Sequence, residues 1–422
     1  MKKIAVVFNG GTISMKVDER IKAAVPSLTG EEIMTMVTGI EDYAEIESYN
    51  FSSLPSPHMT PNLMFELSRF VNKLLERDDI DGVVITHGTD TLEETAYMLD
   101  LTLDSSKPVV ITGAMRSSSE LGYDGPFNLA TSICTAASEK AVGRGVLVCF
   151  NGELNSAREV TKTNSMALNA FRTPNFGPIG IVDNDNVIFY RKCKKGQHVK
   201  IDNIKGDVAL IKCVSGSDCS FIDFAIEKGY IGIVIEALGR GNIPPQMVHG
   251  VERAIKRNIP VVIVSRCFEG RVFDSYGYEG GGKDLRNRGA IFGDTMQGQK
   301  ARIKLMVALS YTDEYSAIKE FMETNDELCR TGFKAQFISS TMSPLVSLVS
   351  YIGIAIIGAI GAIDAIRGII TTGNLQAFIR YIWQINQPLS QVTQLSSAMQ
   401  SAVAAMERVI EILDEEEQIK DK

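Results

Sequence analysis

The sequence has few of the residues that hold metal ions or build disulfide frameworks. Its 422 residues include four histidines and seven cysteines, with no Cys-x-x-Cys pair and no two histidines at the spacing of metal ligands. The cysteine number is odd and most thiols lie in apolar stretches, which is typical of a reduced, cytosolic protein. We therefore expect buried free thiols, no metal site and no cofactor.

An excess of positive charge, the usual mark of nucleic-acid binding, is also missing. Lysine and arginine number 43 and aspartate and glutamate 51, so the net charge is −8 and the isoelectric point about 5.3. The G-x-x-x-x-G-K-[ST] loop that cradles ATP phosphates does not occur. No secretion signal precedes the first apolar run, Lys3–Asn9. We therefore expect neither nucleic acid nor ATP as a partner.

Charge of either sign is scarce near the C-terminus. Although 22% of the whole chain is charged, residues 335–406 contain only Asp364, Arg367 and Arg380. Leu345–Ile363 is uncharged and long enough to cross about 30 Å of hydrocarbon as a helix, and a buried core helix is the alternative. Leu375–Ala405 carries six glutamines, which suits a helix that lines a cavity or packs against partners. We predict an all-α hydrophobic helical hairpin here.

The rest of the chain alternates short apolar runs with helical patterns, which predicts two α/β domains with parallel sheets. In the first domain we expect strands at 4–8, 83–86, 109–112 and 146–150 and helices at 61–77, 92–103 and 126–139. In the second we expect strands at 208–213, 232–236 and 261–264 and helices at 221–228, 245–258 and 297–309. The predicted divisions are a domain at 1–190, a linker at 191–206, a domain at 207–324 and the tail at 325–422.

Small polar residues follow three of these strands, at the edge where parallel sheets bind ligands. Thr12 comes after two glycines, so its hydroxyl either faces a ligand or simply ends a turn. Thr89 and Asp90 could bind an oxyanion and an ammonium group, or cap the following helix. Lys162 could activate a hydroxyl group, or be an ordinary exposed lysine. His87 could act as a general base, although a histidine packed beside the turn is the more ordinary interpretation.

Several segments stand out by their order along the chain. Each of the first two segments contains a threonine directly after a glycine; they are Asn9–Ser14 and His87–Ala96. Shorter segments follow in sequence: Gly113–Arg116, Asp124–Pro126, Arg158–Thr163, Pro174–Pro178, Gly239–Asn242 and Gln299–Arg302. Over about residues 1–322 this pattern resembles the bacterial-type L-asparaginases, and the co-occurrence of the segments favours the functional interpretation of each.

The resemblance implies an amidohydrolase of two α/β domains that forms a homo-oligomer, a dimer of dimers, and converts L-asparagine to L-aspartate and ammonia. In that family the threonine matching Thr12 forms an acyl-enzyme, supported by residues matching Thr89, Asp90 and Lys162. The residues implied to bind substrate are Ser56, Thr89, Asp90, Ala114 and Asn242. An alternative is the asparaginase-like subunit of a glutamyl-tRNA amidotransferase, which usually carries an extra N-terminal domain, whereas this chain starts directly at the first strand.

Three positions depart from the family's pattern. Asn9 stands where the first signature usually begins with threonine, and we expect little effect because asparagine can also hydrogen-bond in the turn. Pro57 follows Ser56 where secreted enzymes often have glutamine, which removes one side-chain amide from the substrate site. Residues 15–39 contain no tyrosine, although the secreted enzymes carry one there. Our candidates for its proton-handling role, with an ordinary turn of packed tyrosines as the alternative, are Tyr276, Tyr278 and Glu279.

The tail resembles a different family. Lys334–Phe337, Ala365–Gly368, Gln387–Leu389 and Glu407–Val409 are similar to segments in the last two transmembrane helices of ABC exporters, over about residues 326–417. This resemblance implies catalytic domains in the cytoplasm and membrane association through about residues 345–405. It leaves one further alternative, a membrane-transporter fragment that carries an inactive asparaginase fold.

Overall fold

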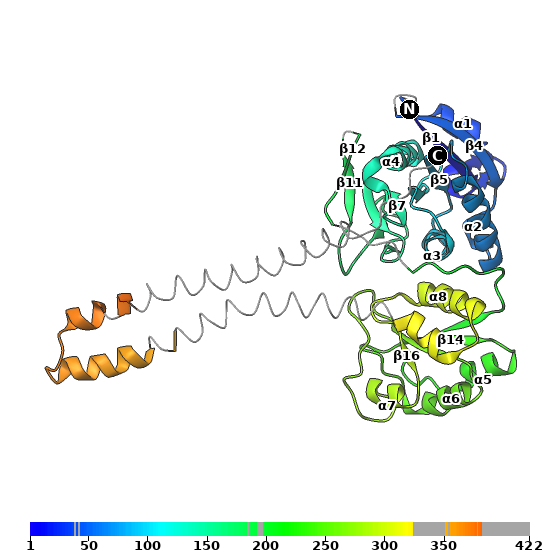
Figure 1. The fold of residues 1–422 in the computed structure, drawn as a ribbon. Coiled ribbons are helices and arrows are strands. Elements are labelled where there is room, and N and C mark those ends of the chain that lie inside the picture. Colours follow the sequence, from blue (N-terminus) through cyan, green and yellow to red (C-terminus); the bar gives the residue numbers. More distant parts are fainter. Residues whose placement is uncertain are drawn as a thin grey trace, which may run out of the picture. The chain divides into compact units, whose positions relative to one another are not determined.

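The computed structural model describes residues 1–323, except 38, 41–42, 184 and 192–196, and residues 351–381, except 353–354 and 378. The chain forms two compact units, Met1–Thr324 and Asn325–Lys422. In Figure 1 the first unit runs from blue to yellow and holds all the labelled helices and strands, while the orange helices belong to the second.

An eight-stranded sheet forms the core of the N-terminal half. Its first five strands along one side are parallel, and three antiparallel strands extend it on the other side. In spatial order the strands are β4 (Ala44–Ser52), β1 (Lys2–Asn9), β5 (Gly82–Thr86), β6 (Val109–Thr112), β7 (Val146–Phe150), β8 (Glu153–Ser156), β11 (Gly180–Asp183) and β12 (Asn186–Phe189).

Helices bury this sheet on both faces, as predicted. Alternate residues of β1 point to opposite faces, so Ala5 and Val7 join one hydrophobic cluster and Ile4 and Val6 join another. The first cluster is closed by α2 (Pro61–Leu75) and α3 (Leu92–Thr102), and the second by α4 (Gly125–Ala137). The central strands and these three helices confirm the expected elements to within a few residues.

The shorter elements of this half were not predicted. These edge and hairpin strands are short or mix polar with apolar residues, so they lack a continuous apolar run. Besides β4, β8, β11 and β12 they are β2 (Met15–Asp18), β3 (Ala23–Pro26), β9 (Thr161–Lys162) and β10 (Phe171–Arg172), with the short helices α1 (Gly30–Thr35), η1 (Thr12–Ser14), η3 (Ser56–His58) and η4 (Glu139–Ala141).

The C-terminal half holds a second, four-stranded parallel sheet. Its strands in spatial order are β13 (Val208–Lys212), β14 (Gly232–Ala237), β15 (Val261–Ser265) and β16 (Ile291–Phe292). The helices are α5 (Ser220–Glu227), α6 (Pro245–Lys256), α7 (Gly282–Asn287) and α8 (Gly298–Tyr311). Buried residues of α8 share one hydrophobic cluster with Tyr97 and Met98 of α3, so the two halves are joined by a common core.

In the second unit, residues 355–366 and 372–377 are helical. Much of the predicted Leu345–Ile363 span, and most of Leu375–Ala405, lies outside the described residues. Among the residues that are described, no helix has both the length and the apolar character needed to cross a membrane. The helical hairpin therefore stays a prediction.

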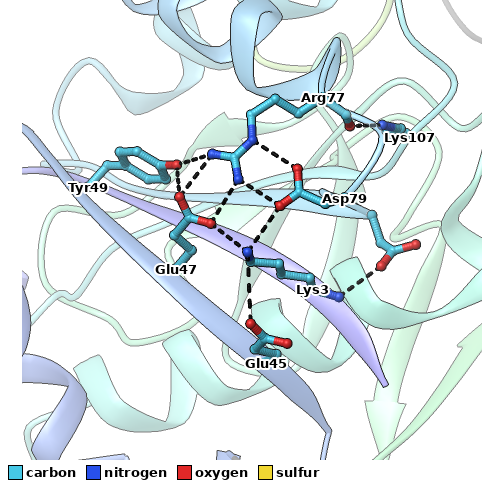
Figure 2. Close-up of polar contacts among 8 residues, drawn as sticks. Lys3, Glu45, Glu47, Tyr49, Arg77, Asp79 and Lys107 are labelled. Atoms are coloured by element: carbon cyan, nitrogen blue, oxygen red, sulfur yellow. Dashed lines mark hydrogen bonds and ion pairs between the residues drawn. The ribbon is translucent and has the colours of Figure 1, made fainter.

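A network of ion pairs ties together the amino ends of β1 and β4 and the loop after α2 (Figure 2). Lys3 Nζ lies 2.9 Å from a Glu47 carboxylate oxygen and 3.0 Å from Asp79. Arg77 reaches the same two carboxylates at 2.9 and 2.7 Å and also donates to the Tyr49 hydroxyl at 2.6 Å. Hydrogen bonds from Arg77, and then from Lys3, lower the pKa of Glu47 from 4.5 to about 2.

We expect this network to make stability depend on acid pH. Because the Glu47 pKa is depressed by folding, its contribution is complete above the ordinary pKa of 4.5 and declines as pH falls toward 2. Glu47→Gln should lower the free energy of unfolding by about 1 kcal/mol at pH 7, with a smaller loss near pH 3. Urea unfolding followed by far-ultraviolet circular dichroism measures both.

Glu45→Gln is the matched control on the same strand, because its side chain is 66% exposed and lies 3.8 Å from Lys3. Equal losses for the two variants at pH 7, or a loss for Glu47→Gln that does not shrink in acid, would contradict the network's role.

Candidate active site

The candidate site lies where three neighbouring parallel strands end. Phe8 of β1 pairs with Thr86 of β5, and Thr86 pairs with Thr112 of β6. The loops that follow these residues therefore begin at the same level of the sheet. They carry the polar segments that the sequence placed at strand ends.

Glycine packing brings two of these loops into direct contact. Gly11 has a φ of +86°, and a β-carbon added to it would lie 2.3 Å from the Cα and N atoms of Gly88. A β-carbon on Gly88 would in turn lie 2.7 Å from Cβ of Ser56. Thr12 directly follows Gly11 and Thr89 directly follows Gly88, so both threonines lie next to this contact between the two loops. Thr12 is half-buried and opens η1, whereas Thr89 is buried.

Lys162 connects the second threonine to an acid. Its Nζ atom donates to Oγ1 of Thr89 at 2.8 Å and to Oδ1 of Asp90 at 2.7 Å. The lysine side chain is 16% exposed and that of Asp90 is 60% exposed. The ammonium is therefore mostly covered, and the carboxylate faces solvent. The arrangement fits a lysine that orients a hydroxyl better than an ordinary exposed lysine.

Ser56 completes this face of the site. Its hydroxyl oxygen accepts a hydrogen bond from the Asp90 amide at 3.1 Å, and its carbonyl oxygen accepts one from the Thr91 hydroxyl at 2.8 Å. Since the serine oxygen acts as an acceptor here, its own proton remains available to a ligand. The next residue is Pro57, which lies inside η3.

His87 is a packed histidine. It is fully buried, with Nδ1 2.8 Å from the Gly88 carbonyl oxygen and Nε2 2.9 Å from the Thr95 hydroxyl. Burial lowers its pKa to about 4. The ring is therefore neutral at physiological pH, and both of its nitrogens are engaged in holding the turn. This geometry favours the structural interpretation over that of a general base.

Asn9 behaves as expected at its unusual position. Its Oδ1 atom accepts a hydrogen bond from the Ser52 hydroxyl at 2.6 Å, and its backbone amide donates to the Thr86 hydroxyl at 3.4 Å. The asparagine side chain thus links β1 to β4 just before the glycine turn.

The remaining predicted residues make no side-chain hydrogen bond to this cluster among the described residues. Ala114 follows β6 and is fully buried, so its backbone is what it can offer a ligand. Asn242 lies in the C-terminal half, where its Oδ1 atom accepts from the Gly282 amide at 3.3 Å. The rings of Tyr276 and Tyr278 are half-exposed and 5.6 Å apart.

Tyr276, Tyr278 and Glu279 occupy one loop before α7. Within the described part of the chain, their side chains make no hydrogen bond or ion pair to Thr12 or to Lys162. The proton-handling role that the resemblance suggested for them stays a prediction.

Two residues near the site were not among the predicted ones. Glu93 is buried on α3, and its Oε1 atom accepts from the backbone amide of Lys162 at 3.3 Å. The hydroxyl of Tyr123 donates to the carbonyl oxygen of Ile13 at 2.6 Å, next to Thr12. Burial raises the Tyr123 pKa, so the phenol remains a donor at neutral pH. Glu93 could have been found from the sequence, because it is an acidic residue on an otherwise buried face of the helix. No local sequence pattern indicated that Tyr123 would lie near the site.

The arrangement offers hydroxyl chemistry. It combines two threonine hydroxyls, a lysine that donates to one of them, an open carboxylate and a serine. In the part of the chain that the structure describes, no three His, Cys, Asp or Glu side chains converge closely enough to share a metal ion. A hydroxyl nucleophile attacking a polarised carbonyl carbon is the reaction that these groups suit.

Comparison with known families gives two matches along the chain. Residues 3–195 match the family model described as "Asparaginase, N-terminal". Residues 207–322 match the model described as "Glutaminase/Asparaginase C-terminal domain". Together the matched segments take in most of the first compact unit.

Individual proteins are similar over the same region. An L-asparaginase of Bacillus licheniformis is 38% identical over 73% of this chain and 96% of its own length. A glutamyl-tRNA(Gln) amidotransferase subunit of Methanobrevibacter smithii is 32% identical over 77% of this chain and 76% of its own length. A crystal structure of a probable cytoplasmic L-asparaginase from Campylobacter jejuni matches with a TM-score of 0.69 and 32% identity, covering 76% of this chain and 99% of that one.

Proposed function

The chain belongs to the asparaginase family, and from that premise we propose that it hydrolyses L-asparagine to L-aspartate and ammonia. The observation that carries the proposal is the position of Lys162 Nζ, 2.8 Å from the Thr89 hydroxyl and 2.7 Å from Asp90, beside the turn that presents Thr12. These are the groups that an amide hydrolysis through a threonine ester requires.

In the proposed reaction the Thr12 hydroxyl attacks the side-chain amide carbon of asparagine. The new bond is an ester, the carbon–nitrogen bond breaks, and the threonine proton passes to the leaving nitrogen to give ammonia. Lys162 donates to the Thr89 oxygen, which leaves the Thr89 proton free to point toward the substrate or a water molecule. Water then cleaves the ester, which releases aspartate and restores the Thr12 hydroxyl.

The two ends of the substrate have complementary partners in the same cluster. Asp90 keeps a solvent-facing carboxylate that can pair with the α-ammonium group. Ser56 can donate its hydroxyl proton to the α-carboxylate while it accepts the Asp90 amide. Ala114 and Asn242 are proposed to complete the substrate site, and Asn242 would do so from a neighbouring copy of a homo-oligomer, a dimer of dimers.

Removing the nucleophile should abolish turnover. Thr12→Ala should lower kcat by roughly three orders of magnitude or more, because the covalent step needs that oxygen, while the fold stays intact. Thr12→Ser, which keeps the oxygen, is the control and should retain far more activity. Ammonia release from L-asparagine is the measurement. If Thr12→Ala kept more than about a tenth of the rate, the covalent role would pass to another residue, and Thr89 would be tested next.

Asp90 should discriminate substrates by their α-ammonium group. Succinamate, which is asparagine without the α-amino group, should react with kcat/KM lowered by roughly 10² or more, because the Asp90 carboxylate is left without its partner. Asp90→Asn should be slow with asparagine and show much less discrimination between the two compounds. A preference that persists unchanged in Asp90→Asn would exclude this pairing.

A second candidate function rests on the similarity to the amidotransferase protein of Methanobrevibacter smithii. An amidotransferase subunit would need a tRNA-bound substrate complex, whereas an asparaginase would act on free asparagine, and this difference can be measured. Ammonia release by the purified chain from free L-asparagine favours an asparaginase, and release only in the presence of a glutamyl-tRNA partner system favours the alternative.

We also propose that the catalytic part divides at the linker near residues 191–206 and that the tail at 325–422 associates with a membrane. The first is supported by the two family models, which match 3–195 and 207–322 separately. The second rests on the low charge of residues 335–406 and on their resemblance to ABC-exporter helices.

Shortening the chain tests the tail. A chain that ends at Thr324 keeps the whole first compact unit and should be as active per site as the full chain. The full chain should sediment with membranes, because the uncharged Leu345–Ile363 segment is apolar enough to enter a bilayer. An inactive shortened chain beside an active full chain would assign the tail to the enzyme. A monodisperse full chain in detergent-free buffer would remove the membrane proposal, and an inactive full chain beside an inactive short one would favour a passive fold.

A further inference from the structure

Lys300 is a buried lysine that crosses from one half of the first unit to the other. It lies in the first turns of α8 in the C-terminal half and is 1% exposed. Its Nζ atom donates to the carbonyl oxygens of Ala157 at 2.7 Å, of Arg158 at 3.2 Å and of Val160. An ammonium group has three protons, so these three acceptors satisfy it completely. A buried charge is tolerated only with such pairing.

The three carbonyls belong to the turn between β8 and β9. The amides of Glu159 and Val160 both donate to the Ser156 carbonyl at 3.1 and 3.0 Å, which folds the turn back on itself. Three carbonyl oxygens that converge on one point repel each other, because each carries a partial negative charge. The ammonium of Lys300 is the positive charge that makes this conformation favourable.

The turn leads directly to the proposed catalytic lysine. Lys162 is the second residue after Val160, so a movement of the turn displaces its backbone. The same backbone is held from α3, where Glu93 Oε1 accepts the Lys162 amide at 3.3 Å. Glu93 Oε2 is buried and has no hydrogen-bond partner among the described residues. Burial lowers the pKa of Lys300 to about 8, and the negative charge of the Glu93 carboxylate opposes this shift.

We propose that Lys300 is a positioning residue for Lys162, which acts across the two halves of the first unit by fixing the 157–160 turn. The proposal deepens the proposed function and rests on it, since Lys162 is placed there as the group that orients Thr89. Lys300 itself does not touch the substrate. It sets the position from which Lys162 Nζ reaches the Thr89 hydroxyl at 2.8 Å.

The same helix supplies a matched control one turn further on. Lys304 is also 1% exposed, donates to the Met322 carbonyl at 3.2 Å and lies 5.1 Å from the Phe321 ring centre. Both of these contacts lie in the C-terminal half. Lys300→Met and Lys304→Met therefore remove the same buried charge from the same helix, and only the first removes the cation from the turn before Lys162.

The first measurement is steady-state kinetics with L-asparagine. Lys300→Met should lower kcat by roughly 10²-fold with little change in KM, because displacing a catalytic group by about 1 Å costs this much. Lys304→Met should keep kcat within about threefold of the parent chain at a comparable loss of thermal stability. Lys300→Gln keeps two N–H donors, so it should fold more readily than the methionine variant and have intermediate activity.

The second measurement does not depend on turnover. Hydrogen–deuterium exchange at the amides of Val160, Lys162 and Thr163 should speed up in Lys300→Met and Lys300→Gln and stay unchanged in Lys304→Met. If the parent chain releases no ammonia from asparagine, the proposed function fails, whereas the exchange data still decide the role of Lys300. Equal kcat for the Lys300 and Lys304 variants, or unchanged exchange at 160–163, would overturn the proposal.

Discussion

The backbone of Gly11 lies so close to that of Gly88 that a β-carbon on Gly11 would overlap the neighbouring chain segment. This contact exists because β1 and β5 are adjacent parallel strands that end at the same level, and because glycine tolerates a φ of +86°. The residues after the two glycines, Thr12 and Thr89, therefore emerge side by side. Ser56 joins them, since its β-carbon would meet one on Gly88 at 2.7 Å.

The two charged side chains that pair in the site differ in their exposure to solvent. Lys162 is mostly covered and Asp90 is mostly open, so a ligand that enters meets a carboxylate first. Behind them lie two buried side chains, Glu93, which accepts the Lys162 amide, and Lys300, which donates to the turn before Lys162. Burial makes these interactions strong and costly to break. The C-terminal half thereby takes part in the site of the N-terminal half through one helix.

The carboxyl ends of the parallel strands carry the candidate site, whereas their amino ends carry the ion-pair network. At the carboxyl ends of β1 and β5 the loops are tight and rich in glycine, and they hold Thr12, Thr89 and Ser56 close together. At the amino ends, Lys3, Glu47, Arg77 and Asp79 form an open ion-pair network that fastens the edge strand to the core. A parallel sheet separates its ends in this way because all strand termini of one kind lie together.

The sequence by itself determined the central strands and the large helices, because a strand buried on both faces and an amphipathic helix each carry a local pattern. It also placed Thr12, Thr89 and Asp90 at strand ends and offered Lys162 as a lysine that could activate a hydroxyl, and the family resemblance added Ser56. Only the tertiary structure decided that His87 is a packed residue, that Tyr123 contacts the Ile13 carbonyl and that Lys300 holds the turn before Lys162. The reason is separation along the chain. Lys300 and its acceptor at Ala157 lie 143 residues apart, and no local pattern records a contact that exists only after both sheets have packed against α3 and α8.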